Sequence, residues 1–387
     1  MSGQATHPII RLSKASVGES ELAAIREVFT KTVNFGLGVH VQEFEAKLKD
    51  FCQTDYEVVA VNTGTSALHA ALVALDFPSG SEVLVPSLTF VASYSAISAA
   101  GLKPVSCEIL FPSCHIDPAD AAKRITDKTV AIMPVAYAGV DFDRKAIYAL
   151  ARKHQLRVIE DDAHAFGSLT ENGRKFGSEG DIVCFSFDGI KNITCGEGGA
   201  IVVRDKNLAH KIRVIRSLGI EKDVELRYHG QRAWDYDVAT QGFRYHMSNI
   251  NAAIGVAQLH KWPELQSKKL KLWAHYLHDL DRRGLLGSLT PTQGFSENVC
   301  MHIFNVILPT EVDRDYVRSA MRESGIETGF HYVPNHLHTM YASNYSLPLA
   351  ERIGKSSLSL PFHPDLTTID VTRVVQTLSQ TLNNPPQ

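Results

Sequence analysis

The chain has 387 residues, of which 44% are hydrophobic and 21% are charged. These values are ordinary for globular proteins, so they exclude a disordered or fibrous chain. Its 39 Lys and Arg residues against 42 Asp and Glu residues give a net charge of −3. This balance predicts no nucleic-acid partner and no anionic-membrane partner.

The opening residues, MSGQATHPII, have neither the basic nor the apolar region of a signal peptide. No stretch approaches the roughly 18 apolar residues that a spanning helix needs. Six scattered cysteines without a CxxC pair are typical of reduced thiols, not of a disulfide or zinc framework. We therefore expect a soluble cytoplasmic protein.

Short β-rich runs alternate with amphipathic stretches from about residue 57 onward. Helical spacing follows at 65–75 and 144–154, and this alternation predicts crossover units and a largely parallel sheet with helices on both faces. The near-continuous apolar runs fit strands that are covered on both sides. The predicted strands lie at 57–61, 82–86, 103–109, 129–135, 156–160, 182–187 and 199–203.

The pattern changes near residue 250. Long helices are predicted there, broken or kinked near Pro263. A strand at 302–308 and a helix at 313–325 follow. We expect a large domain at 1–255 and a smaller α/β domain at 256–387, with the boundary placed to within about ten residues.

The first motif that could carry chemistry is NTGTSALHAAL (62–72). A strand ends, and a helix begins at a Gly64-Thr65-Ser66 turn. Free N–H groups at a helix N-terminus, together with two hydroxyls, can bind a phosphate. Ordinary capping of the first turn is the alternative. The motif is neither a P-loop nor a dinucleotide-binding turn.

The second motif, VIEDDAHAFGS (158–168), places three acids and a histidine after an apolar strand. This is the carboxyl edge, where open α/β sheets bind ligands. Buried carboxylates there need a cationic partner. An N-cap cluster or a metal site are the alternatives, but no second cluster completes a metal site.

The third motif, SFDGIKNITCGEGG (186–199), holds Lys191 in a polar, glycine-rich loop between two strands. A loop lysine is usually a solvated charge, but a desolvated one can form Schiff bases. Together the three motifs supply what pyridoxal phosphate (PLP) needs: a lysine for its aldehyde, a carboxylate for its ring nitrogen and a phosphate cup.

With these motifs the chain resembles the DegT/StrS-type PLP-dependent aminotransferases, which act on nucleotide-linked keto-sugars. The resemblance implies a fold-type-I PLP transferase, with a mostly parallel seven-stranded sheet flanked by helices in the large domain and a smaller C-terminal α/β domain. Beyond the three motifs, it covers GLGVHVQEFE (36–45), PSLTFVAS (86–93), AYAGV (136–140), GFRYHMSNINAAIG (242–255) and GFHYVPNHLH (329–338).

The resemblance also implies roles for single residues. Lys191 matches the Schiff-base lysine, and Asp161 matches the carboxylate at the pyridine nitrogen. The remaining implied contacts are His164 near the phenolic oxygen, Phe90 stacked on the ring, Gly64, Thr65, Ser66 and Ser186 at the phosphate, Arg244 reaching into the neighbouring subunit's site, and His331, Tyr332 and His336 at the substrate. No metal is implied.

Three positions depart from the family pattern. Asp162 replaces a usual alanine, Asp188 a frequent histidine, and Ala136 stands where histidine is common. These changes concern the substrate contacts more than the cofactor chemistry. Some relatives are dehydratases with histidine at the Lys191 position, so the lysine here favours transamination.

The expected function is transfer of an amino group from L-glutamate to a nucleotide-linked 4-keto-6-deoxy sugar, with 2-oxoglutarate released, by a homodimer with shared active sites. The 4-keto preference follows from GFRYHMSN, which resembles the GxNYRM pattern of 4-amino-forming relatives. The product would feed O-antigen, lipopolysaccharide or another glycan. A 3-keto-sugar aminotransferase, a non-catalytic PLP-binding regulator and a nicotinamide-dependent sugar-nucleotide enzyme are the alternatives, the last disfavoured by the missing glycine fingerprint.

Overall fold

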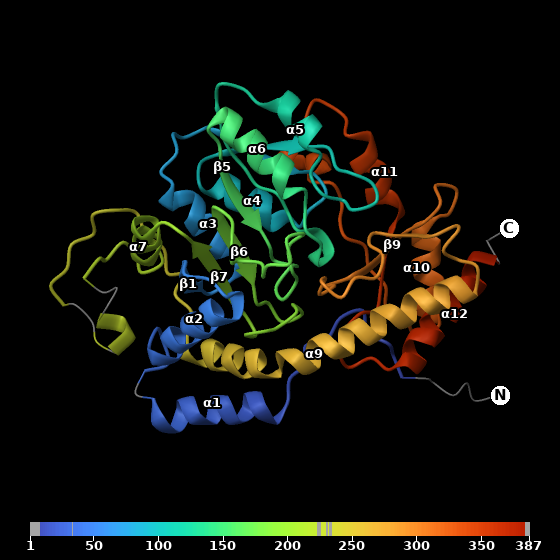
Figure 1. Cartoon of the computed structure of the whole chain (residues 1–387), viewed down its shortest axis with the longest axis horizontal. Helices are drawn as coiled ribbons and strands as arrows, with labels where there is room; N and C mark the ends of the chain where they lie inside the picture. Colours follow the sequence, from blue (N-terminus) through green and yellow to red (C-terminus); the bar gives the residue numbers. More distant parts are fainter. Residues whose placement is uncertain (1–7, 33, 223–225, 230, 232–233, 384–387) are drawn as a thin grey trace.

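The computed structural model describes residues 8–32, 34–222, 226–229, 231 and 234–383. The molecule is elongated, with a large sheet towards one end and a small sheet towards the other (Figure 1). One long helix, α9 (Asn249–Arg282), runs beneath both parts. Both described ends of the chain lie beside the small sheet.

The large sheet has seven strands in the order β1-β7-β6-β5-β4-β2-β3. Only β7 runs antiparallel to its neighbours, so the predicted mostly parallel seven-stranded sheet is confirmed. The strands are β1 (Glu57–Val61), β2 (Glu82–Pro86), β3 (Lys103–Cys107), β4 (Thr129–Ile132), β5 (Arg157–Asp161), β6 (Ile182–Ser186) and β7 (Gly199–Val203).

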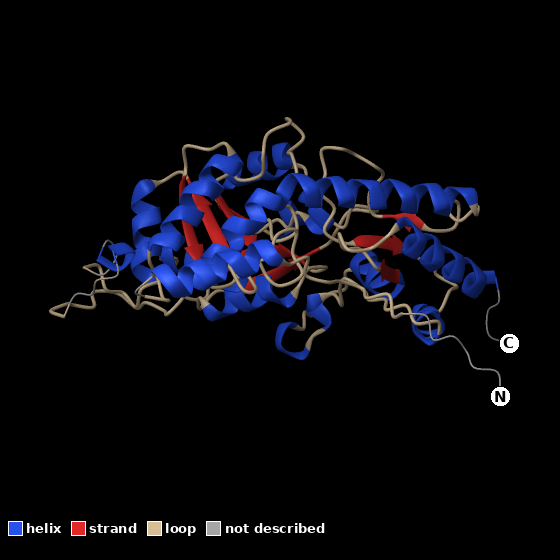
Figure 2. Ribbon diagram, turned by 90° about the horizontal axis from the view of Figure 1, so that it is seen from below, coloured by secondary structure: helices blue, strands red, loops and turns tan. Residues whose placement is uncertain are grey.

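Helices cover both faces of this sheet, as Figure 2 shows from below. Alternate strand residues therefore enter different cores: Val158 packs on one face and Ile159 on the other. The same alternation continues to the polar end of β5. The covering helices are α2 (Val39–Cys52), α3 (Gly64–Ala74), α4 (Val91–Ala99), α5 (Pro118–Arg124), α6 (Arg144–His154) and α7 (Lys206–Ile215). Helix α1 (Glu19–Lys31) packs on α9 instead, and short turns lie at η1 (Tyr137–Gly139) and η2 (Arg227–His229).

The sequence predicted a helix broken or kinked near Pro263, but α9 passes through Pro263 without a break, so a break is wrong and a kink stays a prediction. A proline removes one backbone donor from a helix. Here the neighbouring Trp262 and Leu265 are buried in the core, and α1 and α2 pack along α9. This packing holds the helix continuous. The domain boundary at 255/256 stays a prediction, because α9 crosses it.

The small sheet is antiparallel, in the order β10-β9-β8. Its core includes Trp273 and Tyr276 of α9, and also Ile10, which bridges to Ile326. Its elements are β8 (Thr290–Pro291), β9 (Phe304–Ile307), β10 (Ser357–Leu360), α10 (Arg314–Glu323), η3 (Asn335–Leu337), η4 (Thr339–Tyr341), α11 (Pro348–Ser356) and α12 (Thr368–Asn383). Within the described ranges, no helix is long and apolar enough to cross a membrane.

Candidate active site

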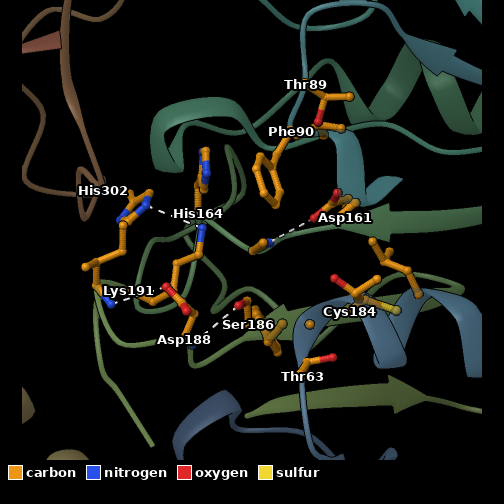
Figure 3. A pocket seen from close by; sticks show the side chains of 18 of the residues that line it. Thr63, Thr89, Phe90, Asp161, His164, Cys184, Ser186, Asp188, Lys191 and His302 are labelled. Atoms are coloured by element: carbon orange, nitrogen blue, oxygen red, sulfur yellow. Dashed lines mark hydrogen bonds between the residues drawn. The ribbon is translucent and has the colours of Figure 1, made fainter. Parts of the chain in front are cut away.

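A cavity of about 410 Å³ opens where strands β5 and β6 end, and Figure 3 shows it closely. Its wall combines residues of the large sheet with residues from beside the small sheet. This is the carboxyl edge that the sequence indicated. Nine of the predicted site residues line it: Gly64, Thr65, Phe90, Asp161, His164, Ser186, Lys191, His331 and Tyr332.

The first turn of α3 forms one wall of the cavity. The N-cap is Thr63, whose Oγ1 accepts a 2.9 Å hydrogen bond from the backbone N–H of Ser66. The Ser66 hydroxyl also bonds to Thr63 Oγ1, at 2.8 Å. Ser66 is buried and does not line the cavity, so in this chain it serves the cap. Gly64 and Thr65 border the cavity.

Gly64 is required by a close approach to Ser186. A Cβ atom at Gly64 would lie 2.7 Å from the Ser186 Cβ, well inside van der Waals contact. The backbone of the α3 turn and the Ser186 hydroxyl therefore border one side of the cavity together. N–H groups at a helix N-terminus next to hydroxyls are a set of donors that suits a phosphate.

Asp161 ends β5 and lies at the cavity, held by two hydrogen bonds. The Ser93 hydroxyl of α4 donates to Oδ2 at 2.7 Å, and the Ala163 N–H donates to Oδ1 at 3.3 Å. Burial raises the pKa of the Asp161 carboxyl, and these bonds and Lys191 oppose the rise. No described residue forms an ion pair with this buried carboxylate, so it is suited to a cationic ligand atom.

Strand alternation separates Asp161 from its two acidic neighbours. Glu160 and Asp162 point to the opposite face, where Arg144 pairs with Glu160 at 2.7 Å and lies 3.8 Å from Asp162. Burial raises the pKa of Asp162 well above its usual range. Asp162 does not line the cavity. Within the described ranges, no group of three or more potential metal ligands occurs.

Lys191 enters the cavity from the loop after β6, and Figure 3 shows its side chain meeting His302. Its Nζ lies 3.4 Å from Nε2 of His302. Burial lowers the pKa of Lys191 to about 8, although Asp161 and Asp188 oppose this. An amine with that pKa exchanges protons readily near neutrality.

His164 is oriented by bonds at both ring nitrogens. The Ala138 N–H donates to Nδ1 at 3.3 Å, so Nδ1 is the acceptor and Nε2 carries the hydrogen that faces the Tyr332 hydroxyl at 3.1 Å. The His164 and His302 rings lie 4.4 Å apart, centroid to centroid. Burial lowers the pKa of both well below the usual range, so both are neutral.

His302 was not predicted from the sequence. It lies 111 residues from Lys191, just before β9, and only the packing of the small sheet brings the two together. Thr63 and Glu197 also line the cavity and were not singled out. The one available signal for Thr63 was its place three residues before Ser66, at the start of the helix.

The aromatic and histidine predictions have different outcomes. Phe90 is 55% exposed, and its ring lies 5.7 Å from that of Tyr332, so it faces the cavity and is not a core phenylalanine. His331 lines the cavity, and its Nδ1 bonds to Ser359 Oγ at 2.6 Å. His336 lies outside, between Ser87 (2.6 Å) and Glu351 (3.2 Å).

Arg244 does not line the cavity of its own chain. It is exposed, and its backbone bridges to Ser217. Its neighbours Phe243 and Tyr245 stack on each other at 5.0 Å and pack against His69 of α3. The segment is therefore anchored to the helix that begins at the cavity, while Arg244 stays free to contact another molecule.

These residues fit PLP. The α3 turn and Ser186 could bind its phosphate, and Asp161, which has no ion-pair partner, could bind its protonated ring nitrogen. Lys191 could bind its aldehyde. Fold and donor set together define a PLP enzyme of fold type I.

The comparisons with known proteins agree. The model of the DegT/DnrJ/EryC1/StrS aminotransferase family matches residues 15–379. TlmJ of Streptoalloteichus hindustanus, an aminotransferase, is 30% identical, with a TM-score of 0.88 over 97% of this chain and 99% of that one. DesV of S. venezuelae is 33% identical, with a TM-score of 0.83 over 93% of each chain.

PseC of Helicobacter pylori, an aminotransferase involved in pseudoaminic acid biosynthesis, is 25% identical, with a TM-score of 0.87 over 96% of this chain and 98% of that one. The chain belongs to the DegT/DnrJ/EryC1/StrS aminotransferase family. It is a PLP-dependent sugar aminotransferase.

Proposed function

We propose that this aminotransferase converts a nucleotide-linked 4-keto-6-deoxy sugar to the 4-amino sugar, with L-glutamate as the donor and 2-oxoglutarate as the second product. The observation that carries the proposal is the pairing, in one cavity, of Lys191 with a pKa near 8 and an unpaired buried Asp161. The 4-keto position rests on the likeness of GFRYHMSN (242–249) to the GxNYRM pattern.

When bound, PLP carries the amino group between the two substrates and withdraws electrons from the reacting carbon. In our proposal the α3 turn and Ser186 hold its phosphate. Asp161, oriented by Ser93, keeps its ring nitrogen protonated through a charge-assisted hydrogen bond. Lys191 binds its aldehyde, and the freed amine moves a proton at the reacting carbon.

Other residues of the cavity would position the reactants. The Nε2–H of neutral His164 is placed to donate to a phenolic oxygen, with Tyr332 beside it. Exposed Phe90 would cover one face of the ring and exclude water. His331 and Tyr332 line the cavity from the small-sheet half of the chain and would contact the sugar.

We further propose that the protein is a cytoplasmic homodimer in which each subunit places Arg244 in the active site of its partner. The product would be used for a surface polysaccharide or another glycan. The shared site is supported by Arg244, because its side chain is exposed while the adjacent Phe243 packs against His69 of α3. The role of PseC in pseudoaminic acid biosynthesis supports a place in carbohydrate assembly.

A panel of nucleotide-linked 3-keto and 4-keto sugars, incubated with ¹⁵N-labelled glutamate, tests this function. We expect ¹⁵N in a 4-amino sugar, identified by mass and NMR. Labelling of 3-amino sugars alone would establish the alternative keto position. A visible absorbance that does not change on adding any amino donor would favour a non-catalytic PLP-binding regulator.

A further inference from the structure

Lys269 of α9 is a buried lysine outside the cavity wall. It is 4% exposed, and its Nζ donates a 2.6 Å hydrogen bond to Oδ1 of Asn192. Its Nζ also lies 5.4 Å from the centre of the Phe362 ring. No carboxylate within the described ranges pairs with it. A buried ammonium without a counter-charge is unfavourable for folding, so its presence calls for another explanation.

The partner of Lys269 is the residue that follows Lys191. The Asn192 amide nitrogen donates to the carbonyl oxygens of Phe166, at 2.9 Å, and Cys300, at 3.1 Å. These two carbonyls lie two residues from His164 and His302 respectively. Asn192 thus ties the Lys191 loop to both histidine segments through its amide nitrogen. Its amide oxygen accepts the hydrogen bond from Lys269.

Lys191 and Lys269 also border a common small cavity of about 10 Å³, and Lys191 lines the main cavity as well. The small cavity has about the space of one water molecule. No acidic side chain of the described residues lines it. Two cations that share a poorly solvated space destabilise each other's charged forms, because few water dipoles lie between them.

Lys14 and His363 also line this small cavity. Lys14 pairs with Asp365 at 2.7 Å, and burial lowers the pKa of His363. Among the described cations at the cavity, Lys269 is therefore the one without a carboxylate partner beside Lys191.

Asp161 from β5 and Asp188 from the loop stabilise the ammonium form of Lys191. The neighbouring histidines are neutral because of burial, and Cys300 faces Lys269. Those histidines are His164, His302 and His331.

We propose that Lys269 is a positioning residue for Lys191: it holds a positive charge at the small cavity that the two lysines share, fixed through Asn192, and so keeps the Lys191 amine available in its neutral form. The inference rests on the proposed role of Lys191 as the cofactor-binding lysine. Burial is the largest cause of the lowered pKa of Lys191, and the charge of Lys269 acts in the same direction, against the two carboxylates. Burial also lowers the pKa of Lys269. A second cation beside a reactive lysine is a known way to activate it.

The test measures the protonation of Lys191 itself. Protein loaded with pyridoxamine phosphate leaves Lys191 free, and protein loaded with PLP occupies it. Each is treated with trace isotopic acetic anhydride from pH 6 to 11, and peptide mass mapping gives the labelling of Lys191. Lys269→Met removes the charge, Lys269→Arg keeps it, and Lys268→Met is the control, since Lys268 is the adjacent residue and pairs with Glu264 on the surface.

In the pyridoxamine form we expect wild type, Lys268→Met and Lys269→Arg to share one inflection pH for the labelling of Lys191. Lys269→Met should raise it by about 0.5–1 pH unit. If Lys269→Met does not fold, Lys269→Gln gives the same comparison. An unchanged inflection in the neutral variants overturns the proposal for Lys269. Equal labelling of Lys191 in the PLP and pyridoxamine forms instead overturns the cofactor-binding role of Lys191, so the two failures are distinguishable.

Discussion

The hydroxyl of Ser93 donates a 2.7 Å hydrogen bond to Oδ2 of Asp161 and thereby fixes the carboxylate at the cavity. Ser93 lies on α4 and Asp161 at the end of β5, so helix and sheet together set the direction of this charge. Glu160 and Asp162, one residue to either side, lie on the other face of the strand and meet Arg144. Of the three acids, Asp161 is the one that lines the cavity.

Asp161→Asn should therefore damage the enzyme and Asp162→Asn should not. Loss of a charge-assisted hydrogen bond predicts PLP affinity about 10–100-fold weaker for Asp161→Asn, with a larger fall in turnover. Asp162 has a raised pKa and does not touch the cavity, so its amide variant should keep turnover within a few-fold. PLP titration by absorbance and steady-state rates measure both. The reverse pattern would show that the acid is assigned one residue out of register.

Gly64→Ala should loosen the phosphate site. The new Cβ would lie 2.7 Å from Ser186 Cβ, and relieving this overlap must move the α3 turn or β6. We expect at least about 10-fold weaker PLP binding and a stability loss of about 1–3 kcal/mol. Gly287→Ala is the control, since nothing lies within 4 Å of its added Cβ. Retained affinity in Gly64→Ala would mean that the phosphate binds elsewhere.

Sharing of active sites can be tested by mixing subunits. Lys191→Ala and Arg244→Ala chains, each nearly inactive alone, are combined under conditions of verified subunit exchange. If Arg244 acts in the partner's site, a mixed dimer holds one site with both residues intact and should recover towards half of the wild-type activity. No recovery despite verified exchange would rule out sharing. An Arg244→Ala chain that stays active on its own would instead indicate that Arg244 makes only a surface ion pair, worth under about 1 kcal/mol.

Much of the fold was predictable because apolar runs and helical spacing report local structure directly. Strands such as EVVAV (57–61) and GAIVV (199–203) were found with their bounds, and Lys191, Asp161 and the α3 turn followed from their places at strand ends. The break predicted at Pro263 is absent, because burial of Trp262 and Leu265 outweighs one lost backbone hydrogen bond.

Residues that meet only through tertiary packing were not predictable. His302 reaches Lys191 across 111 residues, and Lys269 reaches Asn192 across 77. No local pattern marks either contact: His302 precedes an ordinary strand, and Lys269 sits among other lysines of a long helix. His336 shows the reverse case: a matching motif predicted a substrate contact, but the structure holds this histidine between Ser87 and Glu351, outside the cavity.

Chemical trapping tests most directly whether Lys191 is the lysine that binds PLP. The PLP-loaded protein is reduced with borohydride, digested and mapped by mass spectrometry. We predict a pyridoxyl group on Lys191. The Lys191→Ala variant should fold correctly, and its turnover should be lower by a factor of about 10²–10⁴ or more. A pyridoxyl group on another lysine, such as the buried Lys269, would contradict this assignment.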